Sequence, residues 1–284
     1  AGIWQGSTLI ARTGSAAPGA SDVTFRSFGT LALNATGQVA FQAQLTGAGV
    51  DSLNLNDSGI WRDNVLIVRD ADVSPHNGDV RLASVTAPQI NDAGKVSFQS
   101  LLRNSGFSSE FGGFVGLAGS TVAASGDLAP GTEADFSSFA AHQLNAAGQV
   151  AFTAVLRGPS VNASNDVGIW RDSTLIAREG NAAPVAGSGV ILSGVGNAQL
   201  NGVGHVAFRS TLSGTGVTAG NSSALFVGDG VETVLAARNG DALAGSTITS
   251  LSFSAASFND KAQLAYRATL ADGRSGVFLF TPTL

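Results

Sequence analysis

The sequence predicts an all-β fold and, within that class, a five-bladed β-propeller of four-stranded antiparallel blades. One phrase, LNATGQVAFQAQL at Leu33, returns in four variants at intervals of 54 to 58 residues, which is typical of repeat architectures. Each copy is a β-rich run with small residues between bulky ones, as in QVAFTAVL, whereas helical spacing of apolar residues is hard to find. Five such units match propeller blades better than a two-sheet sandwich or a solenoid with shorter rungs.

The unit between Phe136 and Pro184 shows the expected elements in order. FAAHQL forms the first strand, NAAG a turn, QVAFTAVL the second strand and RGPSVNASNDV a long loop, and GIWRD and TLIAR form the third and fourth strands. In the turn, the Asn side chain caps the backbone and the Gly supplies the positive φ before the next strand. The last copy has Ala262 in place of this Gly, so we expect a different or strained turn there.

These units predict a single propeller domain over residues 1–284. The predicted unit boundaries are residues 13–69, 70–125, 126–178, 179–238, and 239–284 completed by 1–12. Neighbouring blades cover both faces of a blade, so the aromatic residue of the phrase should be buried in every copy, at Phe41, Phe98, Phe152, Phe208 and Tyr266. We also expect Trp4, Trp61 and Trp170 to pack between blades.

Composition excludes several classes of function. The chain of 284 residues has a net charge of −5 and only two lysines, Lys95 and Lys261, which argues against nucleic acid and anionic membranes as partners. It has no cysteine, so disulfides and cysteine-ligated metals are impossible, and no cofactor is expected. The absence of Met indicates a processed chain, for which secretion after signal-peptide removal is the simplest explanation. No apolar run is long enough to predict a membrane-spanning helix.

The repeated phrase resembles the tandem Asn-x-x-Gly-x-x-Ala-Phe repeat of secreted bacterial proteins that are often attached to assorted C-terminal surface anchors. The motif residues that match are Asn34, Gly37, Ala40 and Phe41, then Asn145, Gly148, Ala151 and Phe152, then Asn201, Gly204, Ala207 and Phe208. The second copy departs at Ser97 and the fifth at Ala262 and Tyr266. The resemblance covers essentially the whole chain and implies an extracellular surface protein, but it brings no enzymatic role.

Candidate sites lie where the units diverge. The long loops at 46–58, 103–112, 157–167 and 213–223, with crossings such as 70–79 and 125–135, are the predicted variable face. The predicted channel lining is Gln89, His142, Gln143 and Gln199. We interpret the scattered acids of the crossings as solvated charge: Asp70, Asp72, Asp79, Asp127, Asp135 and Asp241. The repeated Arg residues should pair with a neighbouring Asp or carbonyl: Arg12, Arg69, Arg178 and Arg238.

No catalytic spacing accompanies His76, His142 or His205, so the sequence predicts a protein that is not an enzyme. Four Asn-x-Ser/Thr sequons predict N-glycosylation, at Asn34, Asn56, Asn162 and Asn221.

The third-strand phrase occurs six times although every other strand occurs five times. Residues 2–5 and 276–280 are both candidates for one position in the last blade, and TLIAR at Thr8–Arg12 is its candidate fourth strand. We expect residues 1–12 to lie beside residues 262–281, within one molecule or between two, and favour the second because it accommodates both copies. The residues of this predicted junction are Ile3, Trp4, Leu9, Ile10, Val277, Phe278 and Phe280.

Two functions from different classes follow. The leading hypothesis is an extracellular structural or adhesive protein that self-associates into oligomers or fibres through its terminal strands. The alternative is a carbohydrate-binding or carbohydrate-cleaving propeller that uses the variable-loop face and the channel mouth, with glycans as partners.

Overall fold

The computed structural model describes residues 1–51, 53, 55–76, 78–104, 110–117, 119–185 and 188–282, except for the side chains of 104, 110–112, 114 and 197. Residues 52, 54, 77 and 105–109, which fall in the predicted loops and crossings, lie outside this description. The fold is all-β, with one short 3₁₀ turn, η1 (Ala255–Ser257). The chain forms two compact units, Ala1–Asp127 and Leu128–Leu284. Whether these units make one propeller domain stays a prediction.

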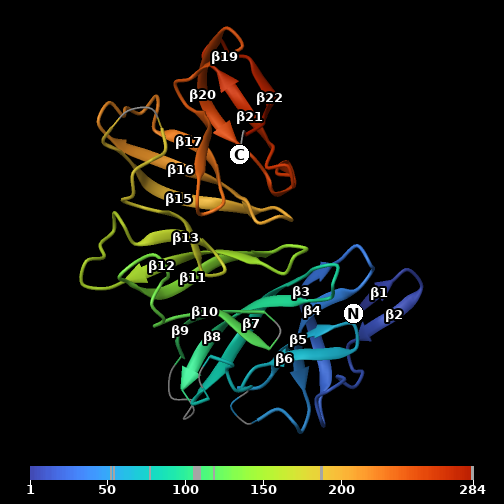
Figure 1. Ribbon diagram of the computed structural model, residues 1–284. Coiled ribbons are helices and arrows are strands. Elements are labelled where there is room, and N and C mark those ends of the chain that lie inside the picture. The colour runs from blue at the N-terminus through green and yellow to red at the C-terminus, as the bar shows by residue number, and fades with distance from the viewer. Residues whose placement is uncertain are drawn as a thin grey trace. The chain divides into compact units, whose positions relative to one another are not determined.

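The first unit contains a hairpin and two four-stranded antiparallel sheets (Figure 1). The hairpin pairs β1 (Gly2–Gln5) with β2 (Thr8–Arg12). The next sheet has the order β3 (Thr24–Leu33), β4 (Val39–Thr46), β5 (Ser58–Arg62), β6 (Val65–Arg69). The following sheet comprises β7 (Val80–Ile90), β8 (Val96–Asn104), β9 (Glu110–Leu117) and β10 (Ser120–Ala124), again in chain order.

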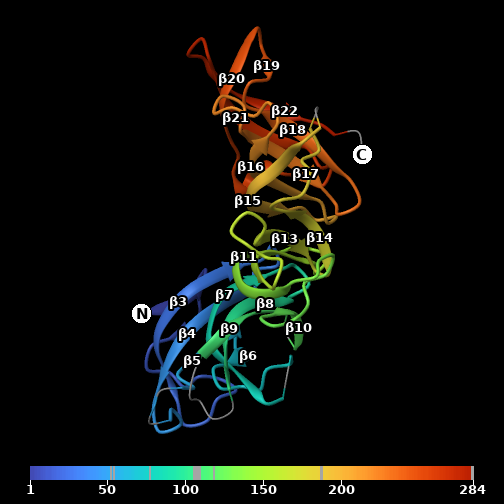
Figure 2. The ribbon, with the colours of Figure 1, turned by 90° about the vertical axis from the view of Figure 1, so that its left-hand side faces the viewer.

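The second unit contains three four-stranded sheets (Figure 2). The first comprises β11 (Asp135–Leu144), β12 (Val150–Arg157), β13 (Val167–Arg171) and β14 (Thr174–Arg178). The second comprises β15 (Val190–Leu200), β16 (Val206–Gly214), β17 (Ser223–Gly228) and β18 (Thr233–Arg238). The third comprises β19 (Ala242–Leu243), β20 (Ser246–Ser252), β21 (Leu264–Leu270) and β22 (Ser275–Phe280).

Each predicted repeat unit therefore holds one antiparallel four-stranded sheet. In the last sheet, β19 pairs with β20 at the edge opposite β22, where the other sheets have isolated bridges such as Ala182↔Ile191. Completion of the outer edge beside β22 by residues 8–12 stays a prediction. Closure of the five sheets into a ring stays a prediction.

The Asn of the repeated phrase links each sheet to the next within a unit. In both units its Oδ1 accepts a hydrogen bond from the backbone four residues later, as from Gln149 N to Asn145 at 2.8 Å. Its Nδ2 donates to the carbonyl of the corresponding Asn of the following sheet, from Asn34 to Asn91, from Asn145 to Asn201 and from Asn201 to Asn259, at 2.9 Å each. The repeated phrase is thus a device for turning the chain and for joining sheets.

The turn geometry agrees with the expectation at the following Gly. Gly148 has a φ of +86°, in the left-handed region that glycine adopts without a steric penalty. Ala262 takes a φ of +56° at the equivalent place, so the last turn keeps its shape at the cost of strain in a residue that carries a Cβ.

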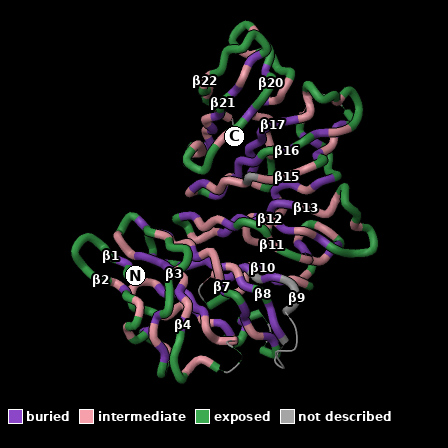
Figure 3. The backbone as a smooth tube through the Cα atoms, turned by 180° about the vertical axis from the view of Figure 1, so that it is seen from behind, coloured by how far each residue is buried: buried purple, intermediate pink, exposed green. Residues whose placement is uncertain are grey.

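The core is divided among the spaces between stacked sheets. The predicted aromatic residues are all buried: Phe41, Phe98, Phe152, Phe208 and Tyr266 are at most 7% exposed. In the second unit, Ile169 and Ala177 of one sheet pack with Phe208 and Phe226 of the next. Figure 3 shows the same pattern, with buried stretches in the strands and exposed stretches in the loops. Because a sheet in the middle of a unit is covered on both faces, its strands carry apolar residues at successive positions.

Candidate functional site

The repeated polar residues are engaged in the structure. Arg171 of the GIWRD phrase donates to the carbonyl of Gly204 in the next sheet, and Asp172 accepts from the backbone of Val150. In the first unit, Arg62 and Asp63 of the same phrase are bonded in the same way, to Gly94 and Val39. Recurring residues are thus explained by the scaffold, so a functional site is best sought among residues that do not recur.

A cavity of about 260 Å³ in the second unit has such a lining. We call it the Glu179 pocket, and its residues are Val167, Glu179, Gly194, Val195, Gly196, Arg209 and Thr211. It forms where the end of β14 and the start of β13 meet β15 and β16 of the next sheet. Glu179 begins the crossing from β14 to β15, so the pocket belongs to the predicted variable face.

Small residues on β15 make the space. A Cβ added at Gly194 would lie 2.5 Å from Thr211 Oγ1 and 3.8 Å from Glu179 Oε1. A side chain at this position would therefore stand between the hydroxyl and the carboxyl group and fill the pocket. Gly196, two residues further along the strand, has no atom within 4 Å of its added Cβ, so the floor is also open there.

Glu179 is the buried acid of the pocket, at 8% exposure. Desolvation by burial raises the pKa of its carboxyl group, and a hydrogen bond with the Asp166 side chain raises it further, while bonds from the backbone of Val167 and Val195 lower it. Val167 N donates to Glu179 Oε2 at 3.3 Å, which anchors the carboxyl group at the junction of two sheets. The side chain is therefore fixed in place and has its charge partly disfavoured.

Two exposed groups complete the polar lining. Arg209 is exposed, lines the pocket and is held by a 3.1 Å bond from its Nε to Ser223 Oγ. Thr211 accepts a hydrogen bond from Ser193 Oγ at 3.3 Å. Carboxyl, guanidinium and hydroxyl groups thus surround a glycine floor, an arrangement that offers both donors and acceptors to a small polar ligand.

A second cavity of about 330 Å³ continues along β15 and shares Gly196 with the Glu179 pocket. Its other lining residues are Ala140, Ala141, Gln143, Ala151, Thr153, Ala198 and Gln199. We call the two cavities together the β15 groove. Gln143 and Gln199, which the sequence predicts as channel lining, lie in it, and Gln143 Nε2 donates to Gln199 Oε1 at 2.9 Å.

The other two predicted lining residues lie elsewhere. His142 is buried at 4% exposure and is not among the residues that line the groove, and desolvation lowers its pKa to about 4. Its place in a channel lining stays a prediction. It pairs with Phe152 across the sheet, so its side chain lies on the opposite face of β11 from that of Gln143. Gln89 is on β7 in the first unit and takes no part in the β15 groove.

The repeated Arg residues hold loops, as the sequence predicts. Arg69, Arg178 and Arg238 each donate from Nε to the carbonyl of an Asn in the long loop of the same sheet, at 2.7 to 2.8 Å. Two of these Asn residues are predicted glycosylation sites, Asn56 and Asn221, and each also donates its own Nδ2 to a loop carbonyl at 3.1 Å.

The four sequons differ in their surroundings. Asn34 is 7% exposed and its Nδ2 donates to both Asn91 O and Gln38 Oε1, whereas the Nδ2 groups of Asn56 and Asn221 each donate to one loop carbonyl. Asn162 is exposed, in the loop between β12 and β13. Glycosylation stays a prediction at all four.

The acids of the crossings are more ordered than solvated loop charge. Asp70 is 7% exposed and accepts from Val85 N at 2.8 Å, and burial raises its pKa to about 7. Asp72 and Asp241 cap the backbone of Arg69 and Arg238, and Asp127 lies 3.4 Å from His76 Nε2. The interpretation of Asp70 as solvated charge is therefore wrong, because this carboxyl joins β7 to the preceding sheet. Asp79 and Asp135 flank the starts of β7 and β11.

The predicted terminal strands form two separate elements. The hairpin β1–β2 has the same bulged register as β13–β14, yet Trp4 is 59% exposed whereas Trp61 and Trp170 are 0% exposed, so the expectation of inter-sheet packing is wrong for Trp4. Ile3 is buried, Ile10 is half-buried and Leu9 is exposed. On β22, Val277 is exposed, while Phe278 and Phe280 are half-buried. The proximity of residues 1–12 to 262–281 stays a prediction.

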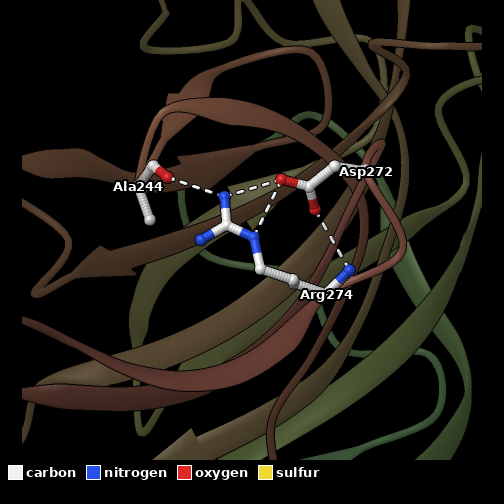
Figure 4. Close-up of polar contacts among 3 residues, drawn as sticks. All are labelled: Ala244, Asp272 and Arg274. Atoms are coloured by element: carbon white, nitrogen blue, oxygen red, sulfur yellow. Dashed lines mark hydrogen bonds and ion pairs between the residues drawn. The ribbon is translucent and has the colours of Figure 1, made fainter.

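One ion pair marks the far end of the last sheet (Figure 4). Arg274 donates to Asp272 Oδ2 at 2.6 and 2.8 Å and to the carbonyl of Ala244 at 2.9 Å, which ties the β21–β22 turn to the β19–β20 turn. Its groups are exposed, so it is a surface clamp of small energetic value.

Within the described ranges, no group of three or more His, Cys, Asp or Glu side chains is arranged to hold a metal ion. No helix among the described residues has the length and apolar character needed to cross a membrane.

Comparison with known proteins places the chain in a family. Residues 1–66 and 56–282 match a family of unknown function, DUF7453. The chain belongs to this family. No curated protein matches this DUF7453 member.

Two solved structures are distantly similar to this DUF7453 chain. One is the polysaccharide lyase Uly1, at 11% identity and a TM-score of 0.37, covering 91% of this chain and 58% of the lyase. The other is an exo-β-1,3-galactanase from Phanerochaete chrysosporium in complex with β-1,3-galactotriose, at 10% identity and a TM-score of 0.26, covering 91% of this chain and 64% of the galactanase. The chain thus spans less than two thirds of either protein, and similarities of this size do not define a common fold or activity.

Sequence reasoning missed the Glu179 pocket. Two departures from the repeat were the available signal. Arg209 replaces the Gln or Thr that the first three copies carry after the repeated Phe. Glu179 comes directly after the repeated Arg, where the other copies have residues other than Glu.

Proposed function

We propose that this chain binds neutral carbohydrate through the Glu179 pocket. The observation that carries the proposal is the pocket itself, in which a buried carboxyl group, an exposed guanidinium and a hydroxyl surround an open glycine floor. Sugar hydroxyls both donate and accept hydrogen bonds, so they match a site that offers acceptors at Glu179 and donors at Arg209. A volume of about 260 Å³ suits a single ring of a small polar ligand.

Electrostatics favour a neutral ligand over a charged one. A ligand amine would pair with Glu179 but would be repelled by Arg209, and a ligand carboxylate would meet the reverse conflict once Glu179 ionises. A neutral hydroxylated ligand bonds to both groups without either penalty. The backbone of Gly196 offers a further contact surface, because no atom lies within 4 Å of a Cβ added there.

The same geometry supports binding rather than cleavage. Glycoside hydrolysis uses two carboxyl groups that flank the scissile bond at roughly 5–9.5 Å from each other. Asp166 is the carboxyl group that acts on the pKa of Glu179. The two side chains are hydrogen-bonded to each other, which leaves no room for a sugar between them. Glu179 is the one carboxyl group among the described residues that line the pocket.

Two broader features belong to the same proposal. We propose that the five sheets close into a propeller, because within each unit the sheets already stack face to face with apolar residues on both faces. We also propose an extracellular location, which the resemblance of the repeated phrase to that of secreted repeat proteins supports. Both fit a protein that meets glycans outside the cell.

A glycan array of neutral mono- and oligosaccharides, probed with the purified chain, tests the proposal. Arg209→Ala should abolish the signal because it removes the exposed donor of the pocket. The matched control is Arg267→Ala, the equivalent exposed residue on β21 of the next sheet, which should bind like the wild type. Wild-type protein that binds no sugar, or equal binding by the two variants, would refute the proposal.

A second proposal rests on a different observation, the exposure of Trp4. Its counterparts Trp61 and Trp170 lie against Phe41 and Phe152 at 6.1 Å between ring centroids, and Trp4 has the same bulged hairpin without such cover. On β21, Tyr266 is the residue equivalent to Phe152, and it already stacks on Phe278 at 5.9 Å.

We propose that β1–β2 of one copy pairs with the outer edge of β22 in the sheet β19–β22 of another copy. Among the described residues β22 pairs on its β21 side only, and Val277 is 77% exposed. Light scattering of Trp4→Ser against the wild type tests this directly. Oligomers that persist in the variant, or a wild type that stays monomeric at high concentration, would exclude this mode of assembly.

A further inference from the structure

We propose that the β15 groove contains a second sugar subsite at Gln143 and Gln199, so that the natural ligand is an oligosaccharide that runs along β15 from the Glu179 pocket. This inference rests on the proposed carbohydrate binding and specifies the class of ligand. The two cavities that form the groove share Gly196, and all their lining residues belong to the second unit.

The amide pair is held in one arrangement. Gln143 Oε1 accepts from Leu200 N at 2.7 Å, and Gln143 Nε2 donates to Gln199 Oε1 at 2.9 Å. Gln143 thus has both ends of its amide engaged and fixes the orientation of Gln199. The Nε2 of Gln199 has no acceptor among the described residues, so it is the donor that the pair presents to the groove. A fixed donor costs little ordering entropy when a ligand hydroxyl accepts from it.

Small side chains leave the space that an elongated ligand needs. Ala140 and Ala141 of β11 face Ala198 of β15 across the second cavity, and Ala141 is exposed. Thr153 of β12 adds a half-buried hydroxyl on the same wall. Alanine methyls give the apolar patches against which sugar C–H groups pack, while Gln199 and Thr153 meet hydroxyls.

The length of the groove exceeds one sugar ring. Gly194 and Gln199 are five positions apart on β15, which corresponds to about 16 Å along a strand. The register of β15 shifts between Gly196 and Gln199, where a bulge turns the amide of Gln199 relative to the glycine floor. Two polar ends separated by a narrow apolar stretch suit a chain of sugars rather than a single one.

The first unit shows how the same place looks when it is filled. Position 153 corresponds to Gln42 of β4, whose Nε2 donates to Val85 O of β7 at 2.9 Å and bridges the two sheets. Gly196 and Ala198 correspond to Thr86 and Pro88. The second unit has the smaller residue at all three positions, which opens the groove.

The experiment compares affinities for matched ligands of different length. Isothermal titration is run with monosaccharides and the corresponding tetrasaccharides of glucose, galactose, mannose and N-acetylglucosamine. We expect the tetrasaccharide of the preferred sugar to bind at least tenfold more tightly than the monosaccharide. Gln199→Ala should remove this gain and leave monosaccharide affinity unchanged, because the Glu179 pocket is intact.

Two further variants keep the test decisive. Ala141→Phe places bulk in the groove from an exposed position, so it should remove the same gain without a loss of folding. Gln89→Ala, the equivalent change on β7, should alter nothing. A tetrasaccharide gain that survives both Gln199→Ala and Ala141→Phe overturns the second subsite but leaves the Glu179 pocket standing. A wild type that binds neither ligand overturns both proposals, whereas Arg209→Ala should weaken monosaccharide and tetrasaccharide alike.

Discussion

The junction of β3–β6 with β7–β10 in the first unit and that of β11–β14 with β15–β18 in the second are built from one plan. The cores are built alike, since Phe98 packs with Ala40 and Ile60 of the preceding sheet and Phe208 packs with Ala151 and Ile169. At both junctions, an Asn side-chain amide donates a hydrogen bond of 2.9 Å to a carbonyl of the next sheet. This shared scaffold therefore does not by itself account for the Glu179 pocket in the second junction.

The two junctions differ in the residues above that scaffold. In the aligned repeats, Ser84, Thr86 and Leu101 of the first unit correspond to Gly194, Gly196 and Thr211 of the second. The strand register differs, since Leu101 pairs with Ala83 whereas Thr211 pairs with Gly194. The acid is retained, as Asp70 and Glu179 respectively, and both are buried. The acid alone is thus compatible with a purely structural role, and the pocket is found where two side chains are absent and a third is smaller.

The largest expected effect tests the shared scaffold. Phe208→Ala and Phe98→Ala should each lower the free energy of unfolding by about 3–5 kcal/mol, because both rings are buried in the core between two packed sheets and leave a cavity there. Denaturant titration of both variants measures the loss. A near-neutral result for one of them would mean that the two junctions do not share a core.

The next effect concerns the Asn that joins sheets. Asn145→Ala removes a bond to Asn201 O and the cap on Gln149 N, and we expect a loss of about 1–3 kcal/mol, since buried backbone groups are left without partners. Asn34→Ala in the first unit is the matched change and should cost a similar amount. Unequal losses, measured by thermal unfolding, would show that one junction depends on this bond and the other does not.

Sequence periodicity predicts this scaffold well because each repeated residue has one local task. The Asn, the Gly and the aromatic of each copy serve a turn, a cap and a core, and those tasks depend on the phrase itself. The Glu179 pocket has a different origin, in the juxtaposition of residues from β13, β14, β15 and β16. Its space results from glycines, which carry no signal of their own in a chain with 37 of them.

The pair of amide side chains could be predicted from the sequence in part. Gln143 and Gln199 share a repeat position, so the sequence predicts that they lie at equivalent places, and the structure brings them together. His142, which the same reasoning groups with them, lies outside the groove because adjacent residues of a strand point to opposite faces and His142 is buried on the other one. The sequence also could not predict the exposure of Trp4, because its local phrase matches that of the buried Trp61 and Trp170.

A smaller effect is the dependence of stability on pH that the buried acid Asp70 should produce. Burial raises the pKa of Asp70 from 3.8 to about 7, so the folded state holds a proton that the unfolded state has released between these values. Stability from this group is therefore complete below pH 3.8 and is lost as the pH rises towards 7. Asp70→Asn keeps an acceptor for Val85 N and should stabilise the protein by at least about 1 kcal/mol at pH 8. Urea denaturation at pH 5 and pH 8 measures this, and an equal effect at both values would contradict it.

The pKa of Glu179 is raised by the same cause, so ligand binding should respond to pH as well. If the ionised carboxylate accepts bonds from sugar hydroxyls, affinity should weaken as the pH falls through this raised pKa. Titrations of the preferred sugar from pH 7 to pH 4 follow the change. Glu179→Gln should flatten the profile, and a wild-type affinity that is constant over this range would show that the carboxylate is not the acceptor.

The most direct test of the carbohydrate site gives the second junction the side chains of the first. The triple variant Gly194→Ser, Gly196→Thr and Thr211→Leu refills the pocket with the residues at the corresponding sequence positions of the first unit. Isothermal titration with the neutral sugar that binds the wild type, alongside circular dichroism to verify the fold, is the measurement. We predict a loss of affinity of at least tenfold with the β-sheet spectrum unchanged. Wild-type affinity in the folded variant would contradict the assignment of the pocket.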